Sequence, residues 1–278
     1  MGQLLVNLGC GSIFHDAWRN FDVEPQSPEV EYLDVRRGVP IAPGTCDAVY
    51  HSHVMEHLVP AEGARLIENC CSLLKPGGIV RVVVPDLEGI AREYVRVLDR
   101  LAEGGDPLAE NDREWMTLEL LDQMVRVRSG GLMAEYWRRE TIPNEAFLRR
   151  RMGWQFSSFR DRVGGADLAA PPRRKPGLRK VLQKLRRRAA SVLVRSTCGR
   201  AAGEAFRESM FRAEGEVHRW MYDRFSMAAL LEASGFEKPR VVGFDESGIE
   251  GFADFGLDSW EGGPRKPDSL YIEARKAP

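Results

Sequence analysis

The sequence predicts an α/β fold that is interrupted by a long helical insertion between its fifth and sixth strands. Residues 4–86 alternate short apolar runs with helical stretches, which is the pattern of parallel strands joined by helices. From residue 87 to residue 217 the chain changes to charged helical stretches, and strand signals return only near its end. We therefore expect one α/β domain, residues 1–86 and 218–278, with residues 87–217 as the insertion.

The first expected element is a buried strand that ends in a glycine turn. Residues 4–8 are apolar except for Asn7, and Gly9, Cys10 and Gly11 follow directly. An apolar run that stops at turn residues is typical of a strand covered on both faces. Glycine has no Cβ and tolerates positive φ, so a ligand can approach the backbone closely at this turn. On the local pattern alone, an ordinary turn explains these glycines as well.

Strands and helices then alternate up to residue 86. Residues 20–23 and 47–51 are expected as short strands. Residues 60–74 have apolar residues at helical spacing, and the Lys-Pro-Gly-Gly sequence at 75–78 ends that helix. Residues 79–84 form a β-branched run, which predicts a further buried strand.

The insertion and the end of the chain carry fewer but clear signals. Residues 88–101 and 115–127 each place apolar residues on one face of a predicted helix. A helix at 226–234 precedes two strands, 240–244 and 269–274. These three elements return the chain to the sheet.

The composition excludes several classes of protein. Hydrophobic residues make up 43% and charged residues 29%, so the chain can bury a core and is not disordered by composition. It has no apolar run of about 18 residues and no signal-peptide pattern at its start. The five cysteines are scattered and lack CxxC spacing, which indicates reduced thiols. We expect a cytoplasmic protein.

The wider set of motifs resembles the class I S-adenosylmethionine-dependent methyltransferases, and the type 11 group in particular. The matching segments are 6–12 (VNLGCGS), 32–35 (YLDV), 47–58 (DAVYHSHVMEHL) and 74–78 (LKPGG), with the acid Asp22 at the end of the second strand. The resemblance covers residues 4–86, and residues 225–274 look like the last helix and strand pair of that fold. It implies a Rossmann-like, mostly parallel seven-stranded sheet that binds S-adenosylmethionine beyond the carboxyl ends of its first strands.

The same resemblance implies a set of cofactor-binding residues. They are Asn7, Gly9, Cys10, Gly11, Asp22, Leu33, Asp34, Val35, Ser52 and His53. Asp22 would accept hydrogen bonds from the ribose hydroxyls, Asp34 would lie by the adenine amino group, and the last two residues would line the methionine end. Two alternatives stay open: Asp22 as a solvated carboxylate at a strand end, and Asp34 as the partner of Arg36 or Arg37 in a surface ion pair.

Three departures from the family pattern qualify this assignment. Asn7 stands where an acid is common, and Ile13 stands where a third glycine is usual. Asp22 follows Gly11 by only eleven positions, against roughly 20 in nucleotide-binding folds, so the first helix should be truncated. A catalytically silent module, which docks to a membrane or a protein through a basic helix, therefore remains the alternative function.

A nicotinamide-dependent reductase shares the pattern of strand, glycine turn and acid. Its fingerprint needs a third glycine at position 14, which is Phe14 here. The chain also has no Tyr-x-x-x-Lys pair. These two features favour the methyltransferase.

Histidines supply the candidate catalytic groups. Methyl transfer needs alignment and exclusion of water, and it needs a base only for a poorly acidic acceptor. We predict His57 and His218 as catalytic, with core packing as the alternative for each. His51, His53 and His57 crowd together, but no carboxylate repeat completes a zinc set, so we expect no metal site.

A basic segment at residues 171–200 breaks the near-neutral balance of the chain. Eleven Lys and Arg residues and no acid lie between Asp167 and Glu204, whereas the remaining chain carries a net charge of -12. Apolar residues recur there at helical spacing, which predicts an amphipathic helix. Two interpretations of this helix stay open. Its basic face is exposed to solvent only, or it makes peripheral contact with the inner face of an anionic membrane. Nucleic acid is disfavoured because the segment has no aromatic residue to stack on bases.

The acceptor of the methyl group is the least determined part of the prediction. Four tryptophans, three of them in the insertion, could stack a sugar or form the core: Trp115, Trp137, Trp154 and Trp220. We expect an S-adenosylmethionine-dependent methyltransferase that acts on a small-molecule or glycan acceptor, such as a saccharide or a lipid-linked glycan.

Overall fold

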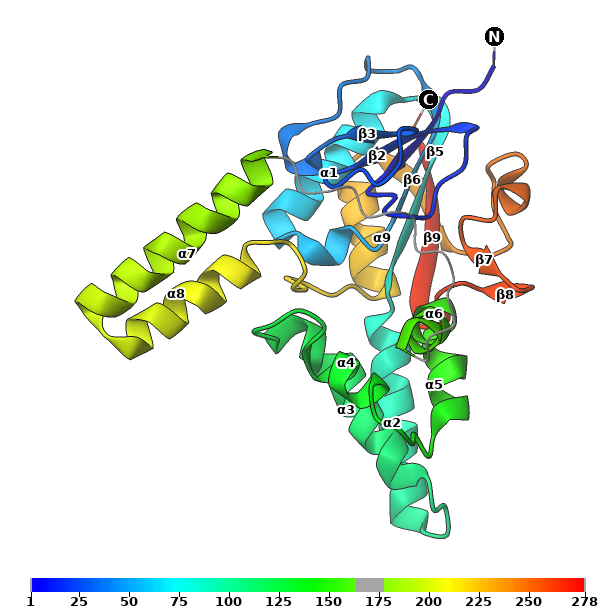
Figure 1. The fold of residues 1–278 in the computed structure, drawn as a ribbon. Helices are drawn as coiled ribbons and strands as arrows, with labels where there is room; N and C mark the ends of the chain where they lie inside the picture. Colours follow the sequence, from blue (N-terminus) through cyan, green and yellow to red (C-terminus); the bar gives the residue numbers. More distant parts are fainter. Residues whose placement is uncertain (1, 164–177, 278) are drawn as a thin grey trace.

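The computed structural model describes residues 2–163 and 178–277, and a seven-stranded sheet forms its centre (Figure 1). The strands are β1 (Leu5–Leu8), β2 (Trp18–Asp22), β3 (Val30–Tyr32), β4 (Cys46–Ser52), β5 (Leu74–Pro85), β6 (Phe236–Val241) and β9 (Ser269–Lys276). Their order is β3-β2-β1-β4-β5-β9-β6, and β9 alone runs antiparallel to its neighbours in this sheet. The predicted fold class is confirmed.

Three strands differ from the sequence-based expectation, and one of them, β6, begins four residues earlier than the strand expected at 240–244. β3 was not predicted as a strand because it has only three residues, of which Val30 alone is buried, so no alternating pattern is visible. β5 begins at Leu74, and its register against β4 shifts between the Cys46 and Ala48 pairs. The Lys-Pro-Gly-Gly sequence therefore lies in an irregular part of the strand instead of ahead of it.

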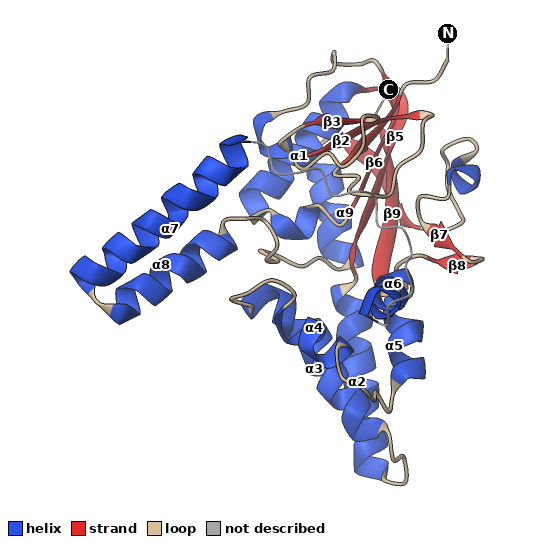
Figure 2. Ribbon diagram, viewed as in Figure 1, coloured by secondary structure: helices blue, strands red, loops and turns tan. Residues whose placement is uncertain are grey.

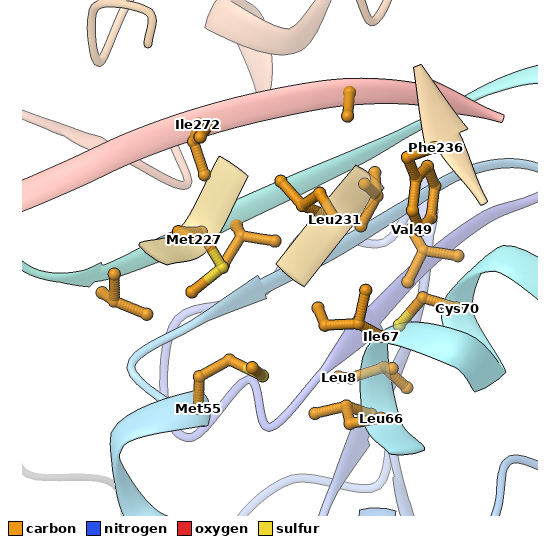
Figure 3. Close-up of a cluster of buried hydrophobic side chains, with 14 of the residues drawn as sticks. Leu8, Val49, Met55, Leu66, Ile67, Cys70, Met227, Leu231, Phe236 and Ile272 are labelled. Atoms are coloured by element: carbon orange, nitrogen blue, oxygen red, sulfur yellow. The ribbon is translucent and has the colours of Figure 1, made fainter. Parts of the chain in front are cut away.

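Two helices cover one face of the sheet, α1 (Pro60–Leu73) and α9 (Arg224–Ala233) (Figure 2). Figure 3 shows Leu8 and Val49 of the sheet packed with Ile67 of α1 and Leu231 of α9. The capping box at Asp223 fixes the start of α9, since the side chain accepts from two backbone N–H groups. This cluster is the main core beneath the parallel strands.

The other face of the sheet is covered by a late loop, residues 243–268, and not by a first helix. The connection from β1 to β2 contains no helix, so the predicted truncation of the first helix is confirmed. The loop carries η3 (Phe252–Phe255) and a small hairpin, β7 (Ser259–Trp260) and β8 (Gly263–Pro264). Phe252 packs edge-on against Trp18 of β2 at 6.2 Å between ring centroids. Aromatic residues of the loop thus replace the missing helix as the cover of β1, β2 and β4.

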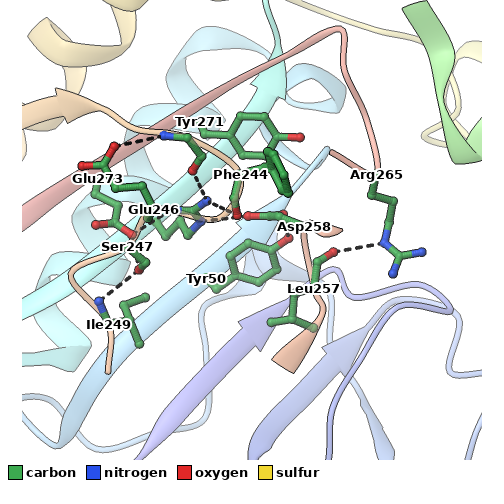
Figure 4. A network of polar contacts seen from close by, with 12 residues as sticks. Tyr50, Phe244, Glu246, Ser247, Ile249, Leu257, Asp258, Arg265, Tyr271 and Glu273 are labelled. Atoms are coloured by element: carbon green, nitrogen blue, oxygen red, sulfur yellow. Dashed lines mark hydrogen bonds and ion pairs between the residues drawn. The ribbon is translucent and has the colours of Figure 1, made fainter. Parts of the chain in front are cut away.

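A buried arginine ties this loop to the sheet. Arg81 of β5 is fully buried, and its Nε donates to Asp258 Oδ2 at 2.8 Å while Nη1 donates to Glu273 Oε1 at 2.9 Å. Tyr50 Oη donates to the other oxygen of Asp258 at 2.6 Å. Figure 4 shows Asp258, Tyr50 and Glu273 converging there. Each acid of the network has a strong donor, which is what buried charges require.

The helical region forms a hydrophobic cluster separate from those of the sheet. Its helices are α2 (Leu87–Glu103), α3 (Ala109–Val125), α4 (Gly131–Trp137), α5 (Glu145–Met152) and α6 (Trp154–Val163). Trp115 and Trp137 are buried in this cluster and stack at 5.6 Å between ring centroids. These two tryptophans are core residues, so they leave the set of candidate acceptor contacts.

Two more helices, α7 (Leu178–Cys198) and α8 (Arg200–Arg212), form a hairpin that projects away from the sheet (Figure 1). α7 agrees with the predicted amphipathic helix, whereas residues 171–177 of the basic segment lie outside the described residues. Within the part of the chain that the structure describes, no helix is long and apolar enough to cross a membrane.

Candidate functional site

A cavity of about 290 Å³ opens where the carboxyl ends of the parallel strands meet the amino end of β9. Its volume is near the lower end of the range for small-molecule sites. Its lining residues are Asn7, Gly9, Cys10, Gly11, Ser12, Ile13, Tyr50, Ser52, His53, His57, Val83, Trp154, Leu257, Asp258, Arg265, Lys266 and Tyr271. Six of the ten predicted cofactor-binding residues therefore lie around one cavity.

The glycine turn has the backbone that only glycine adopts without strain. Gly9 and Gly11 have φ of 68° and 54°. A Cβ at Gly9 would lie 2.4 Å from Val54 Cγ2, so this glycine is also needed for packing. A Cβ at Gly11 would meet nothing within 4 Å, which leaves open space over the backbone. A ligand of the predicted kind fits against this turn.

Asp22 is fixed at the same turn by backbone donors. Its Oδ2 accepts from Gly11 N at 2.8 Å, and its Oδ1 accepts from Glu24 N at 2.7 Å. Each carboxylate oxygen can accept a second hydrogen bond, so the pair of oxygens can still receive two hydroxyls of a ribose. The position fits the predicted role, although Asp22 does not line the cavity itself.

Asn7 gives the cavity a polar wall. Its Nδ2 donates to Asn20 Oδ1 at 3.0 Å, and its own Oδ1 is buried without a partner among the described residues. A buried carbonyl oxygen without a donor is costly, and a ligand N–H group can supply one. Burial raises the pKa of the neighbouring Cys10 to about 12, so the thiol is neutral.

Three other predicted contacts lie at a different hollow. Leu33 and Asp34 line an opening of about 340 Å³ beside η1 (Val35–Arg37). Asp34 accepts two hydrogen bonds from the Arg36 guanidinium at 2.8 Å, and this pairing lowers the pKa of its carboxyl. The ion pair that was left open in the sequence is present. The adenine role of Leu33, Asp34 and Val35 stays a prediction, because the Asp34 carboxylate would have to exchange a hydrogen bond from Arg36 for one from the adenine amino group.

A buried carboxylate, Glu56, forms the centre of a histidine cluster. It lies in η2 (Met55–His57), and its Oε1 is 3.0 Å from His53 Nδ1 and 4.0 Å from His57 Nε2. Burial favours the protonated acid, but the neighbouring histidines, His53 above all, hold the pKa of Glu56 below its usual range. Glu56 is therefore a buried negative charge beside the cavity.

The histidines of this cluster differ in their access to the cavity. The side chain of His57 is 30% exposed and lines the cavity. His53 also lines it, but its Nε2 is hydrogen-bonded to Ser269 Oγ at 2.9 Å. His218 is only 4% exposed, does not line the cavity, and packs edge-on against His57 at 5.0 Å. Burial lowers the pKa of His218 to about 3, so it is neutral.

Backbone contacts explain why His218 reaches this place from far along the chain. Its N–H donates to Gln123 O of α3 at 2.9 Å, and the next two N–H groups donate to Glu56 O. The helical region and η2 thus hold the loop before α9 in position. Both predicted catalytic roles stay predictions, and the geometry favours His57 as the group that can touch a ligand.

The only group of potential metal ligands found among the described residues differs from the one considered in the sequence. Glu56, His57 and His218 each offer an atom within 4.8 Å of the others. His51 belongs to no such group; it is buried in β4, and burial lowers its pKa to about 4. The expectation of no metal is left untested by this geometry.

The charged lining residues that were not singled out from the sequence are Asp258, Arg265 and Lys266. One signal was available for the last two. An antiparallel final strand begins at the edge where parallel strands end, so the residues just before β9 belong at the ligand edge. Trp154 had been weighed only among the four tryptophans, and its place depends on the packing of α6.

Comparisons with known proteins agree with the motifs. A family model described as a methyltransferase domain, of type 11, matches residues 14–82. No curated protein sequence matches the chain. A methyltransferase structure from Thermotoga maritima is 9% identical, with a TM-score of 0.40, and the match covers 99% of this chain and 83% of that one. One from Mesorhizobium loti is 15% identical, with a TM-score of 0.37, over 99% and 91%.

These TM-scores are too low to support a family assignment. The assignment therefore depends on the family match and on the geometry of the site. The matched residues begin at Phe14, just after the glycine turn, run into β5, and include Asp22, Ser52 and His53. The sheet has the seven strands and the mostly parallel arrangement that the resemblance implied. The open glycine turn, the fixed carboxylate and the cavity beside them fit S-adenosylmethionine. Residues 14–82 are therefore a methyltransferase domain of type 11, and the motifs and the fold support a class I S-adenosylmethionine-dependent methyltransferase.

Proposed function

We propose that the enzyme methylates a hydroxyl group of a saccharide or of a lipid-linked glycan, with His57 as the general base. The observation that carries this proposal is the meeting of three features in one cavity: the glycine turn, the accessible imidazole of His57 and the indole of Trp154. They come from β1, η2 and α6, and together they provide a cofactor side and an acceptor side.

The residues around the cavity suit transfer to a neutral hydroxyl. The cofactor supplies a methyl group on a sulfonium, which is already an activated leaving group. His57 would accept the hydroxyl proton as the new C–O bond forms and the C–S bond breaks, leaving the uncharged thioether. The buried charge of Glu56 would stabilise the imidazolium that results. Sulfonium and thioether differ by one positive charge, which the proton on His57 balances.

The polar lining favours a sugar over an apolar acceptor. Asp258, Tyr50, Arg265 and Lys266 all line the cavity and offer acceptors and donors to a hydroxylated ring. Trp154 lies at the same wall, and its ring has Arg265 above it at 5.6 Å. An indole face packs against the C–H face of a sugar, while the polar groups bind the hydroxyls.

A panel of acceptors tests the proposal directly. The purified enzyme is incubated with S-adenosylmethionine and with methyl glycosides, nucleoside-diphosphate sugars, a lipid-linked oligosaccharide, simple amines or carboxylic acids. Formation of S-adenosylhomocysteine is measured together with the mass of the methylated product. We expect methyl ethers with at least one sugar class. Turnover confined to amines or carboxylic acids would overturn the proposal, and so would no turnover with any sugar.

Cofactor binding has its own test in Asp22. We expect Asp22→Asn to raise the Kd of S-adenosylmethionine about tenfold to a hundredfold, because hydrogen bonds to a charged acceptor contribute about 1.5–3 kcal/mol. Isothermal titration calorimetry measures the change. Asp16→Asn alters an exposed carboxylate on the same connection and should leave Kd unchanged. An unchanged Kd in Asp22→Asn would show that Asp22 is only a solvated strand-end carboxylate.

A further inference from the structure

Helix α7 carries an apolar stripe that lies open to solvent. Leu182, Leu185, Val192 and Leu193 are between 44% and 68% exposed. Their spacing of three, seven and one residues places them on one side of a helix with 3.6 residues per turn. Four large aliphatic side chains on one exposed side are unusual for a surface helix, which normally turns its apolar side to the core.

The stripe points away from the partner helix of the hairpin. The residues of α7 that are partly covered include Arg187, Ala190, Ser191 and Val194. Helical geometry places their mean direction roughly 160° from that of the stripe. The ion pair of Arg187 with Glu214 lies on this covered side, where the end of α8 returns. The contact with α8 therefore leaves the apolar stripe without a cover.

Exposed arginines flank the stripe on both sides. Arg186 lies at one border and Arg188 and Arg195 lie at the other, and all three are exposed. Residues 178–198 contain no Asp or Glu. An arginine beside an apolar stripe can lay its aliphatic stem along that surface and keep its guanidinium at the level of anionic headgroups.

We propose that α7 lies in the surface of an anionic lipid bilayer, with the apolar stripe in the headgroup–acyl boundary and the flanking arginines on the lipid phosphates. Apolar insertion and anion attraction are the two contributions to such binding, and α7 provides both. The projection of the hairpin away from the sheet lets α7 reach a flat surface without the body of the enzyme in the way (Figure 1).

The other occupants fit less well. A nucleic acid would use the arginines, but residues 178–198 have no aromatic side chain for stacking, and the aliphatic stripe would stay uncovered. A second copy of α7 would bring its own arginines against the first set, with no acid between them. An anionic bilayer would bury the apolar stripe and would also pair with the arginines that flank it.

Vesicle flotation of the full-length enzyme tests the inference. Phosphatidylcholine vesicles with and without phosphatidylserine are compared at low and at high salt. We expect binding to the anionic vesicles only, and weaker binding at high salt because ions screen the attraction. Leu185→Glu with Leu193→Glu should weaken it by about tenfold or more, since two charges enter the apolar boundary.

A matched control is available in the same hairpin. Ala201→Glu with Ala205→Glu changes the net charge of the enzyme equally but on exposed positions of α8. We expect nearly wild-type flotation from this variant. Circular dichroism confirms that both variants keep their helices, and turnover of a soluble acceptor should be unchanged in both. The assay therefore separates membrane binding from the proposed catalytic function.

Several outcomes would overturn the inference. They are wild-type enzyme that does not float with anionic vesicles, equal flotation with neutral vesicles, and equal losses in the two double variants. A stripe variant that loses binding to an oligonucleotide or loses self-association, with vesicle binding unchanged, would assign α7 to nucleic acid or to a dimer instead.

Discussion

Replacing His57 with glutamine is expected to lower kcat on the sugar acceptor by roughly 10²–10⁴-fold, the usual contribution of a general base. The Kd of S-adenosylmethionine should stay nearly unchanged, because the glycine turn and Asp22 are untouched. His57 is the histidine of the Glu56 cluster that is best placed to touch a ligand, because its side chain is 30% exposed and lines the cavity. By contrast, His53 is hydrogen-bonded to Ser269 and His218 is buried. Rapid-quench turnover and calorimetry measure the two quantities.

A positioning role for His57 would leave a different signature. If the imidazole takes the proton, an acceptor with a more acidic hydroxyl should narrow the gap between wild type and variant. A purely structural effect would lower turnover of all acceptors by the same factor. His218→Asn is the companion variant: it removes a buried neighbour of His57, and we expect a smaller loss of kcat that does not depend on the acidity of the acceptor.

The same experiment distinguishes a base from a metal ligand. Glu56, His57 and His218 are close enough to hold an ion, and a metal-bound His57 could not accept a proton. Turnover by the wild-type enzyme should therefore survive treatment with a chelator. Loss of turnover that only added Zn²⁺ or Mn²⁺ restores would contradict the base assignment.

Replacing Arg81 with methionine is expected to lower the free energy of unfolding by about 3–5 kcal/mol, the usual cost of breaking a buried ion pair. Arg81 is fully buried and donates to Asp258 and Glu273, which are themselves buried. The variant leaves Asp258 without its cation and Glu273 with only Arg240, whose Nη2 lies 3.5 Å away. Urea denaturation followed by tryptophan fluorescence measures the loss.

The control variants show whether charge or packing is responsible. Arg92→Met removes an exposed pair with Glu88 on α2 and should change stability by less than about 1 kcal/mol. A triple variant that adds Asp258→Asn and Glu273→Gln to Arg81→Met should recover part of the loss, because no unpaired charge remains. If Arg81→Met costs no more than Arg92→Met, the network does not stabilise the loop at 243–268.

The sheet could be predicted from the sequence where local pattern and motif coincide. The run before Gly9, the β-branched strand after residue 78 and the helix before it are each specified by a few neighbouring residues. β3 could not be found in this way, since two of its three side chains are exposed. The cover of the second face could not be found either. Phe252 and Trp18 are 234 positions apart, and no local pattern connects them.

The site shows the same division. Gly9, Gly11 and Ser52 were expected at the cavity because their motifs resemble those of a family that binds its cofactor at the carboxyl ends of the first strands. Glu56 was visible in the motif, but its burial involves the loop at His218, which α3 positions through a backbone hydrogen bond. The ion pair of Asp34, by contrast, was visible from neighbouring residues alone. Its neighbour Arg36 offered an ion pair in the sequence, and the structure contains that pair.

The loop that replaces the first helix also affects how the sheet can fold while the chain is being synthesised. The sheet face over β1 and β4 is closed by Phe252 and Asp258, and Asp258 is made 208 residues after Tyr50, its partner in β4. Non-local contacts of this kind slow folding, and apolar surface that waits for its cover is open to aggregation. The nascent chain therefore carries an uncovered sheet face until this loop has been made, although the glycine turn beside that face is synthesised long before it.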